Sequence, residues 1–229
     1  MKGIIQVGTI AAMACAAFCH AEASTAAQTS NTSSLKTYKE KNYDHLIGNV
    51  PGLNDDLLKM HLKLYKGYVD NSNLLLQKLT ALQAKGEMRS PEFAGLKRML
   101  GWEMDGMRLH EYYFDSFGKS PLLADDHPLM KKIVSDWGSY SNWKSDFIAT
   151  GLMRGIGWSV AYIDPSENRL INMWINEHDV GHLAGGNPIV IMDVFEHAYM
   201  PQYGLDRAKY IDVFFENLNW NEIAKRYKP

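Results

Sequence analysis

Cysteine is almost absent from this sequence. Only Cys15 and Cys19 are cysteines among the 229 residues, and both lie inside an uncharged, mostly apolar run at residues 4–19. If export removes that run, no cysteine is left, so neither a disulfide bond nor a cysteine nucleophile is available. Any metal ion that the remaining chain binds must then be held by nitrogen and oxygen ligands.

The apolar run at residues 4–19 is too short to span a membrane. A lysine precedes it, and the small residues Ala21 and Ala23 follow it at positions typical of a signal-peptide cleavage site. We therefore predict a signal peptide over residues 1–23, cleaved after Ala21 or Ala23, and a periplasmic or extracellular protein; an uncleaved anchor is the alternative. Residues 24–40 are rich in Ser, Thr and Asn, which predicts a flexible linker.

Neither sign of charge predominates in the chain. The 24 Lys and Arg residues and the 26 Asp and Glu residues leave a formal net charge of −2. We therefore expect no nucleic acid partner and, after signal cleavage, no membrane partner. Apolar residues make up 46% of the chain, and a mature chain of about 200 residues with such a composition can bury an ordinary core.

Helical patterns fill the first part of the chain, and strand patterns appear only in the second part. Asn54 is a capping residue before one apolar helical pattern, and Ser90-Pro91 has the same role before another. We predict an α+β fold, in which an antiparallel helical hairpin (41–120) precedes a domain (121–229) with a small three-stranded antiparallel sheet and surrounding helices. The expected helices are 54–84, 90–118, 128–137, 141–152 and 209–228, and the expected strands are 157–163, 169–176 and 189–194.

Four residues on these elements are candidate metal ligands. Asp193 lies at the end of the last expected strand, where a side chain is held rigidly, and His197 follows it. His61 and His110 lie on the apolar sides of the two long helices. Taken alone, each histidine is more often a hydrogen-bonded side chain of the core than a metal ligand. Two histidines and a carboxylate with an open position are, however, typical of iron or manganese redox sites.

The surroundings of these candidates resemble a known protein family. Four motifs occur in the expected order between residues 45 and 227, on the expected elements. Together they resemble the iron/manganese superoxide dismutases: His61 with Tyr68-Val69, His110-Glu111-Tyr112-Tyr113, Gly157-Trp158, and Asp193-Val194-Phe195-Glu196-His197-Ala198-Tyr199 followed by Tyr203, Arg207, Tyr210 and Asn219-Trp220.

That resemblance implies an enzyme that converts superoxide to oxygen and hydrogen peroxide. It implies one iron or manganese ion per subunit, with His61, His110, Asp193 and His197 as its ligands. The metal alternates between its +3 and +2 states, and peroxide formation consumes protons that neighbouring hydrogen-bonding groups must supply. The residues do not decide between iron and manganese.

The resemblance also implies a set of residues around the metal. Tyr68 is similar to the family's gateway tyrosine, and Trp158 and Phe195 are similar to residues near the metal. Many members have a Gln that tunes the metal, supplied by the second helix or by the sheet. Gly106 offers no side chain on the helix, and His178 falls at the sheet position. We expect His178 to tune the metal; an exposed loop histidine is the alternative.

Two further residues bear on assembly and access. Glu196 is similar to the residue that hydrogen bonds a metal-binding histidine of the partner subunit, which implies a homodimer or a higher homo-oligomer. Arg207 is similar to an arginine near the entrance of the site, where a positive charge attracts the superoxide anion. An ordinary surface salt bridge is the alternative for Arg207.

Three residues depart from the family pattern. Phe195 replaces a Trp, Met200 replaces a Tyr, and Leu64 replaces the His that pairs with that Tyr across the dimer interface. These changes support an alternative function: a weakly active or inactive metal-binding or interaction protein on the same scaffold. A mononuclear iron oxygenase fits less well, because three histidines and a carboxylate leave too few open positions on the metal.

Overall fold

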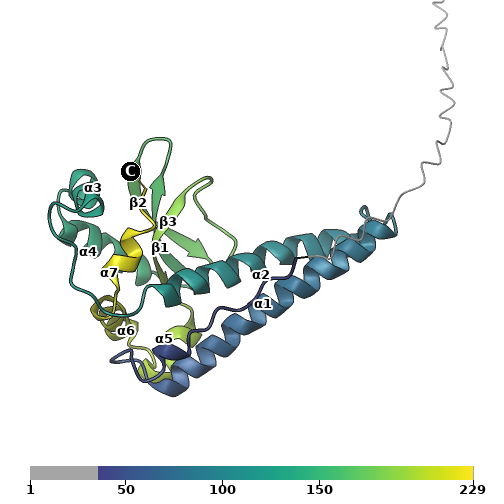
Figure 1. Cartoon of the computed structure of the whole chain (residues 1–229), viewed down its shortest axis with the longest axis horizontal. Helices are drawn as coiled ribbons and strands as arrows, with labels where there is room; N and C mark the ends of the chain where they lie inside the picture. The colour runs from purple at the N-terminus through teal and green to yellow at the C-terminus, as the bar shows by residue number, and fades with distance from the viewer. Residues whose placement is uncertain (1–35, 229) are drawn as a thin grey trace, which may run out of the picture. The chain divides into compact units, whose positions relative to one another are not determined.

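The structure combines a pair of long helices with a small sheet and several shorter helices (Figure 1). The computed structural model describes residues 36–228. The predicted signal peptide (1–23) and the predicted linker (24–40), except for its last residues, lie outside the described part. The described residues fall within one compact unit, Leu35–Pro229. The boundary between a hairpin domain (41–120) and an α+β domain (121–229) stays a prediction.

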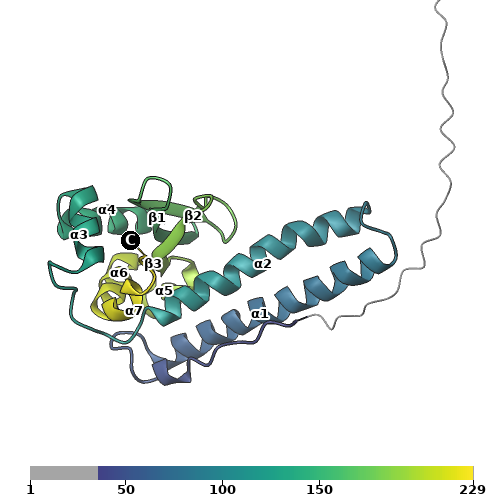
Figure 2. The same ribbon diagram turned by 45° about the horizontal axis from the view of Figure 1, so that its top comes forward.

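The hairpin consists of α1 (Asp55–Ala84) and α2 (Pro91–Asp115), which pack side by side (Figure 2). Each helix begins where its capping residue predicts: the side chain of Asn54 accepts a hydrogen bond from the Leu57 amide, and that of Ser90 accepts one from the Phe93 amide. A short 3₁₀ helix, η1 (Asp44–Leu46), precedes the hairpin. None of the helices between residues 36 and 228 has the length and apolar character that crossing a bilayer requires.

The second half contains the antiparallel sheet, with strand order β2-β1-β3. The helices α3 (Pro128–Trp137) and α4 (Tyr140–Gly151) precede the three strands β1 (Gly157–Asp164), β2 (Arg169–Asn176) and β3 (Asn187–Asp193). The central strand β1 is buried almost throughout, and its register places Trp158 directly opposite Asp193. The predicted α+β fold, with a helical hairpin and a three-stranded antiparallel sheet, is confirmed.

The predicted closing helix (209–228) is wrong. The structure has two helices there, α6 (Arg207–Glu216) and α7 (Trp220–Ala224). A further helix, α5 (Glu196–Tyr203), precedes them, and the sequence did not predict it. The break lies at two asparagines: the Asn217 side chain donates to the carbonyls of Pro51 and Val213, and Asn219 caps α7 by accepting from the Glu222 amide. Asparagine competes for backbone hydrogen bonds in this way and is favoured at helix ends.

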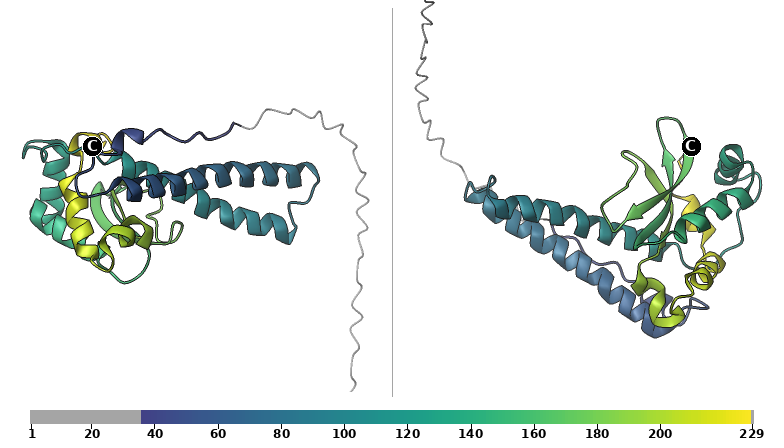
Figure 3. Two further views of the ribbon diagram at one scale, coloured as in Figure 1. Left: turned by 90° about the horizontal axis from the view of Figure 1, so that it is seen from below. Right: turned by 180° about the vertical axis from the view of Figure 1, so that it is seen from behind.

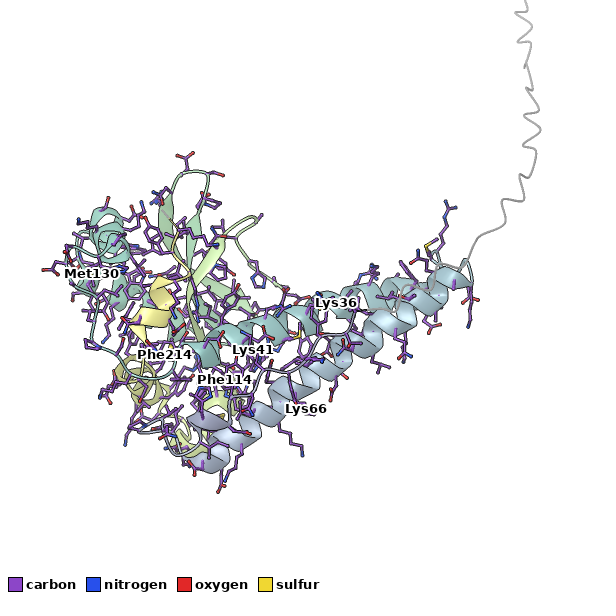
Figure 4. The ribbon with its side chains drawn as sticks, in the orientation of Figure 1. Lys36, Lys41, Lys66, Phe114, Met130 and Phe214 are labelled. Carbon is purple, nitrogen blue, oxygen red and sulfur yellow. The ribbon has the colours of Figure 1, made fainter. Side chains whose placement is uncertain are left out.

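The core lies where one end of the hairpin meets the sheet and the C-terminal helices, while the other end of the hairpin extends away from them (Figure 3). Phe114 on α2 and Phe214 on α6, both labelled in Figure 4, are fully buried there. Lys66 lies on the outer side of α1, where it pairs with Asp70. Helix α1 packs against α5 and α2 packs against β3, so residues far apart in sequence meet at this end.

Candidate metal centre

Three imidazoles from three different helices converge on one carboxylate oxygen at the end of a strand. His61 of α1, His110 of α2 and His197 of α5 direct their Nε2 atoms toward Oδ2 of Asp193 at the end of β3, at 3.0, 3.6 and 3.1 Å respectively. One ligand atom from each residue lies within 4.8 Å of the others. Among residues 36–228 this is the one group of three or more His, Cys, Asp or Glu residues with such a geometry. The structure therefore brings together the four residues that the sequence predicts as ligands.

The environment of His110 fits a bound metal ion. Its Nδ1 lies 2.6 Å from the carbonyl oxygen of Gly106, and because a carbonyl only accepts, Nδ1 must carry the proton. The neutral ring then has a lone pair on Nε2. That atom is buried and has no hydrogen-bond partner within residues 36–228. A buried acceptor without a partner is costly, and a metal ion in the centre of the cluster removes that cost.

The charge states of the cluster also suit a metal ion. Burial lowers the pKa of His61 and of His110, so both rings are neutral and offer lone pairs. Burial by itself raises the pKa of Asp193, but its interactions with His197 and His61 outweigh that effect and lower it, so the carboxylate is ionised. Metal binding requires these deprotonated forms. Burial lowers the pKa of His197 too, but its interactions with Asp193 outweigh that effect and raise it, so a metal ion that binds there displaces the His197 proton. Three imidazoles and one carboxylate are donors that suit iron and manganese.

Two tyrosines that the sequence did not mark as functional hold Asp193 in place. The Tyr210 hydroxyl donates to the Asp193 carbonyl oxygen at 2.7 Å, and it lies 3.0 Å from the Tyr113 hydroxyl. The second carboxylate oxygen of Asp193, Oδ1, accepts a hydrogen bond from the backbone N–H of Phe195 at 2.8 Å. Both tyrosines are fully buried. Their spacing in the sequence does not distinguish them from other buried tyrosines, so this role was visible only in the structure.

A second set of residues, Trp158, His178 and Tyr68, forms a hydrogen-bonded row beside the cluster. The indole N–H of Trp158 donates to Nδ1 of His178 at 3.0 Å, and Nε2 of His178 lies 2.7 Å from the Tyr68 hydroxyl. The Tyr68 ring stacks on His110, with ring centroids 5.0 Å apart. His178 is fully buried, so the alternative of an exposed loop histidine is wrong.

Phe195 and Gly106 shape the space around this row. The Phe195 ring stacks on His178 and on His197, with centroid distances of 4.6 and 5.2 Å. It therefore forms a wall between the two imidazoles. A Cβ atom on Gly106 would lie 2.7 Å from Cδ1 of Tyr68, so only glycine lets the Tyr68 ring take this position.

Glu196 and Arg207 lie at the edge of the site. Glu196 is the first residue of α5 and its side chain is exposed. The Arg207 guanidinium donates to the carbonyls of Gly151, Met153 and Gly155 and to the Tyr199 hydroxyl, which ties down the turn before β1. The interface role of Glu196 and the entrance role of Arg207 stay predictions.

The chain is similar in sequence to proteins of one known family. Residues 125–226 match the family model of the C-terminal domain of iron/manganese superoxide dismutases. The chain is 36% identical over 181 residues to an iron superoxide dismutase of Cupriavidus metallidurans, an alignment that covers 77% of this chain and 89% of that protein. It is 32% identical over 179 residues to a manganese superoxide dismutase of Haloferax volcanii, with coverages of 78% and 88%. Identity to an iron superoxide dismutase of Aquifex aeolicus is 30% over 200 residues, with coverages of 85% and 93%.

Proposed function

Because the chain belongs to the iron/manganese superoxide dismutase family, we propose that it converts superoxide to oxygen and hydrogen peroxide. In this proposal one iron or manganese ion per subunit is held by His61, His110, Asp193 and His197. The observation that carries it is the buried Nε2 of His110, which has no hydrogen-bond partner in the described part of the chain and faces the same carboxylate oxygen as the other two imidazoles. When bound, the ion supplies the change between +2 and +3 states that superoxide dismutation requires.

The chain's own residues supply an ordered source of protons. Two superoxide anions and two protons give one oxygen and one hydrogen peroxide, so a donor must stand near the metal. Because Trp158 donates to Nδ1 of His178, that nitrogen is an acceptor and the proton lies on Nε2, directed at the Tyr68 oxygen. The hydroxyl proton of Tyr68 is then free to point elsewhere. Burial raises the pKa of Tyr68 and keeps the hydroxyl protonated at neutral pH.

Tyr68 also connects the site with the surface. Together with Leu64, Trp102 and Glu103 it lines a surface cavity of about 480 Å³. A small anion that enters there meets the Tyr68 ring, which stacks directly on His110. In our proposal this cavity is the route of superoxide to the metal, and Tyr68 controls its inner end.

The test is activity after separate loading with each metal. The purified protein is stripped of metal, reloaded with iron or with manganese, and its metal content and its rate of superoxide removal are measured. We expect about one ion per chain and activity with at least one of the two metals. Full occupancy by both metals in turn, with no superoxide removal above that of the free ions, would refute the proposal.

The alternative function is a weakly active or inactive metal-binding protein on the same scaffold. Phe195, where the family has Trp, favours it, because this ring lies between His178 and His197 and its size affects both. Stopped-flow mixing of the metal-loaded protein with superoxide separates the two functions. Cycling of the metal between its oxidised and reduced spectra supports the dismutase, whereas a metal that superoxide leaves unchanged supports the alternative.

We further propose that the protein is a homodimer. Leu64 and Met200 are large apolar side chains with exposed fractions of 37% and 38%, and the exposed Glu196 is next to His197 in sequence. A second subunit that covers this face gives Glu196 a histidine partner. Analytical ultracentrifugation of the wild type and of Glu196→Ala tests this; a wild type that sediments as a monomer at every concentration contradicts it.

Export to the periplasm or the extracellular space is also part of the proposal. It rests on the predicted signal peptide (1–23), which lies outside the described residues. Cell fractionation of the native host with N-terminal sequencing of the recovered protein tests it. An N-terminus at residue 22 or 24 in the exported fraction supports the proposal, and an intact protein in the cytosol contradicts it.

A further inference from the structure

The loop that joins β2 to β3, residues 177–186, has a fixed backbone at its start although it contains no helix or strand (Figure 1). The amide of Asn176 donates to the Val180 carbonyl at 2.8 Å, which closes a tight turn around His178. Gly181 follows with a φ of 105°, and a Cβ atom there would lie 2.8 Å from the Trp174 carbonyl oxygen. The turn therefore places His178 and His182 on one short, constrained segment.

His182 makes two hydrogen bonds whose directions can be assigned. Its Nε2 lies 2.7 Å from the backbone carbonyl oxygen of His178, and its Nδ1 lies 2.7 Å from the Tyr162 hydroxyl. A carbonyl only accepts, so Nε2 of His182 must carry a proton. In the neutral ring Nδ1 then accepts the Tyr162 proton. His182 thus binds the backbone of the same residue whose side chain faces Tyr68.

Both groups that hold His178 belong to the central strand of the sheet. Trp158 and Tyr162 lie on β1, four residues apart, and are fully or almost fully buried. Trp158 holds the His178 ring directly. Tyr162 holds the His178 backbone through His182. The His178 ring is therefore held at its Nδ1 atom and at its main chain by one rigid element.

A carboxylate on α2 stands beside this arrangement. Oδ2 of Asp105 lies 3.7 Å from Nε2 of His182, the nitrogen that donates to the His178 carbonyl. Asp105 precedes Gly106, the residue whose missing side chain admits the Tyr68 ring. His182 consequently lies between the strand that holds His178 and the helix that carries His110.

We propose that His182 is a positioning residue, which acts through His178 and directs the Nε2–H of His178 at Tyr68. His182 is not one of the four candidate ligands, and the sequence did not indicate this role for it. The inference rests on the proposed function, because His178 matters for dismutation only if the cluster holds a redox metal. Without the bond from His182, the 177–186 loop keeps its turn but loses the hold on the His178 carbonyl.

The test uses His182→Leu, which removes both hydrogen bonds, and His182→Gln, which retains one donor and one acceptor. The reduction midpoint potential of the bound iron or manganese is measured for each. We expect His182→Leu to shift the potential in the same direction as His178→Ala but by less, with metal content unchanged, and His182→Gln to restore most of the wild-type value. Val180→Ala, at an exposed position of the same loop, is the matched control and leaves the potential unchanged.

A double-mutant cycle separates positioning from a general structural effect. If His182 acts through His178, then His182→Leu has no further effect on the potential in a His178→Ala background. An equal shift in both backgrounds, or a wild-type potential in His182→Leu, overturns the inference. Should His182→Leu fail to fold, Tyr162→Phe removes only the hydroxyl that holds His182, and the same comparison is made with that variant.

A second measurement does not depend on dismutase activity. In protein loaded with diamagnetic zinc, the ring ¹⁵N shifts of His178 report which nitrogen carries the proton. We expect the single Nε2–H form in the wild type and a mixture of forms in His182→Leu. If superoxide removal is absent but this change is seen, the proposed function fails and the positioning role stands. A single Nε2–H form in both proteins contradicts the positioning role, whatever the activity.

Discussion

The two ends of the α1–α2 hairpin are built from the same kind of helix but differ in burial. The proximal end, which comprises residues 57–69 of α1 and 103–114 of α2, contains buried residues at most inward positions, His61 and His110 among them. The distal end, residues 73–102, leaves Leu74, Met88 and Met99 between 45% and 50% exposed. The same apolar periodicity and helix capping produce the helices at both ends, so these signals do not decide at which end the site lies.

What differs is the packing against the C-terminal half. The proximal end brings His61 and His110 to Asp193 of β3, and there a polar side chain can be both buried and provided with partners. The distal end packs mainly against the other helix of the hairpin, with single contacts from Tyr38 to Asn73 and from Trp102 to Glu177. Among residues 36–228, no group of side chains that could hold a metal ion converges there. A chemical site therefore appears where three or more elements meet.

The largest effect is expected at the proximal end, from His110→Ala. This change removes the candidate ligand whose Nε2 has no hydrogen-bond partner among residues 36–228 and leaves a hole between Tyr68 and Asp193. We expect metal affinity to fall by more than about 100-fold, beyond the loss typical of changes around a metal site, and dismutase activity to fall with it. Metal analysis after dialysis and an activity assay measure both. The exposed His45→Ala is the control and leaves metal content at the wild-type level.

A matched pair of glycines on α2 gives the next comparison. Gly106→Ala places a methyl group 2.7 Å from the Tyr68 ring, whereas Gly95→Ala at the distal end meets nothing within 4 Å. We expect Gly106→Ala to keep its metal but to lose about tenfold in activity, because Tyr68 must move away from His178. Gly95→Ala should retain full activity and gain about 0.5–1 kcal/mol of stability, since alanine is the better helix former.

Activity and thermal unfolding of the two glycine variants provide the measurement. Equal activities for both would mean that the position of Tyr68 is unimportant. A loss of stability in Gly95→Ala would mean that the distal end is less open to solvent than its exposure indicates.

The smallest effect is expected where the two ends of the hairpin join. Glu103 of α2 is 6% exposed, and its Oε2 has no hydrogen-bond partner within residues 36–228. Burial raises its pKa, although a hydrogen bond from Asn71 partly offsets the shift. The folded protein then binds this proton more tightly than the unfolded chain does. The destabilisation is absent below the ordinary pKa of 4.5 and grows as the pH rises through the raised pKa.

Glu103→Gln removes that penalty. We expect the variant to unfold later than the wild type at pH 8, because the neutral amide carries no charge that must be buried. At pH 4 the two proteins should unfold together. Thermal unfolding at both pH values is the measurement, with the exposed Glu87→Gln of the distal turn as control. A gain at pH 4 equal to that at pH 8 would show that ionisation of Glu103 is not its cause.

Much of the fold could be predicted because its signals are local. The caps at Asn54 and Ser90 mark the starts of both long helices, and alternation and β-branched residues mark the three strands. The closing helix at 209–228 was wrong because its break depends on Asn217 hydrogen bonding to Pro51, a residue far away in the chain. Helix α5 was missed because it contains Pro201 and only eight residues.

In the candidate site, too, some residues could be predicted from the sequence and others could not. The four cluster residues could be named in advance through their resemblance to family motifs. The supports of Asp193 by Tyr210 and Tyr113, and of His178 by His182 and Tyr162, could not be. Each depends on a hydrogen bond between residues whose spacing carries no pattern, and many buried tyrosines and loop histidines look the same in a sequence.

The sequence by itself determined the two long helices, the three strands, their order and which residues have the chemistry to bind iron or manganese, because propensity, capping and side-chain type act over a few neighbouring residues. Only the tertiary structure decided which nitrogen of His110 and of His178 carries the proton, which end of the hairpin is enclosed, and that Gly106 makes room for Tyr68. Those outcomes depend on atoms brought within about 3 Å of each other from distant segments. Such contacts exist only when the whole chain is packed.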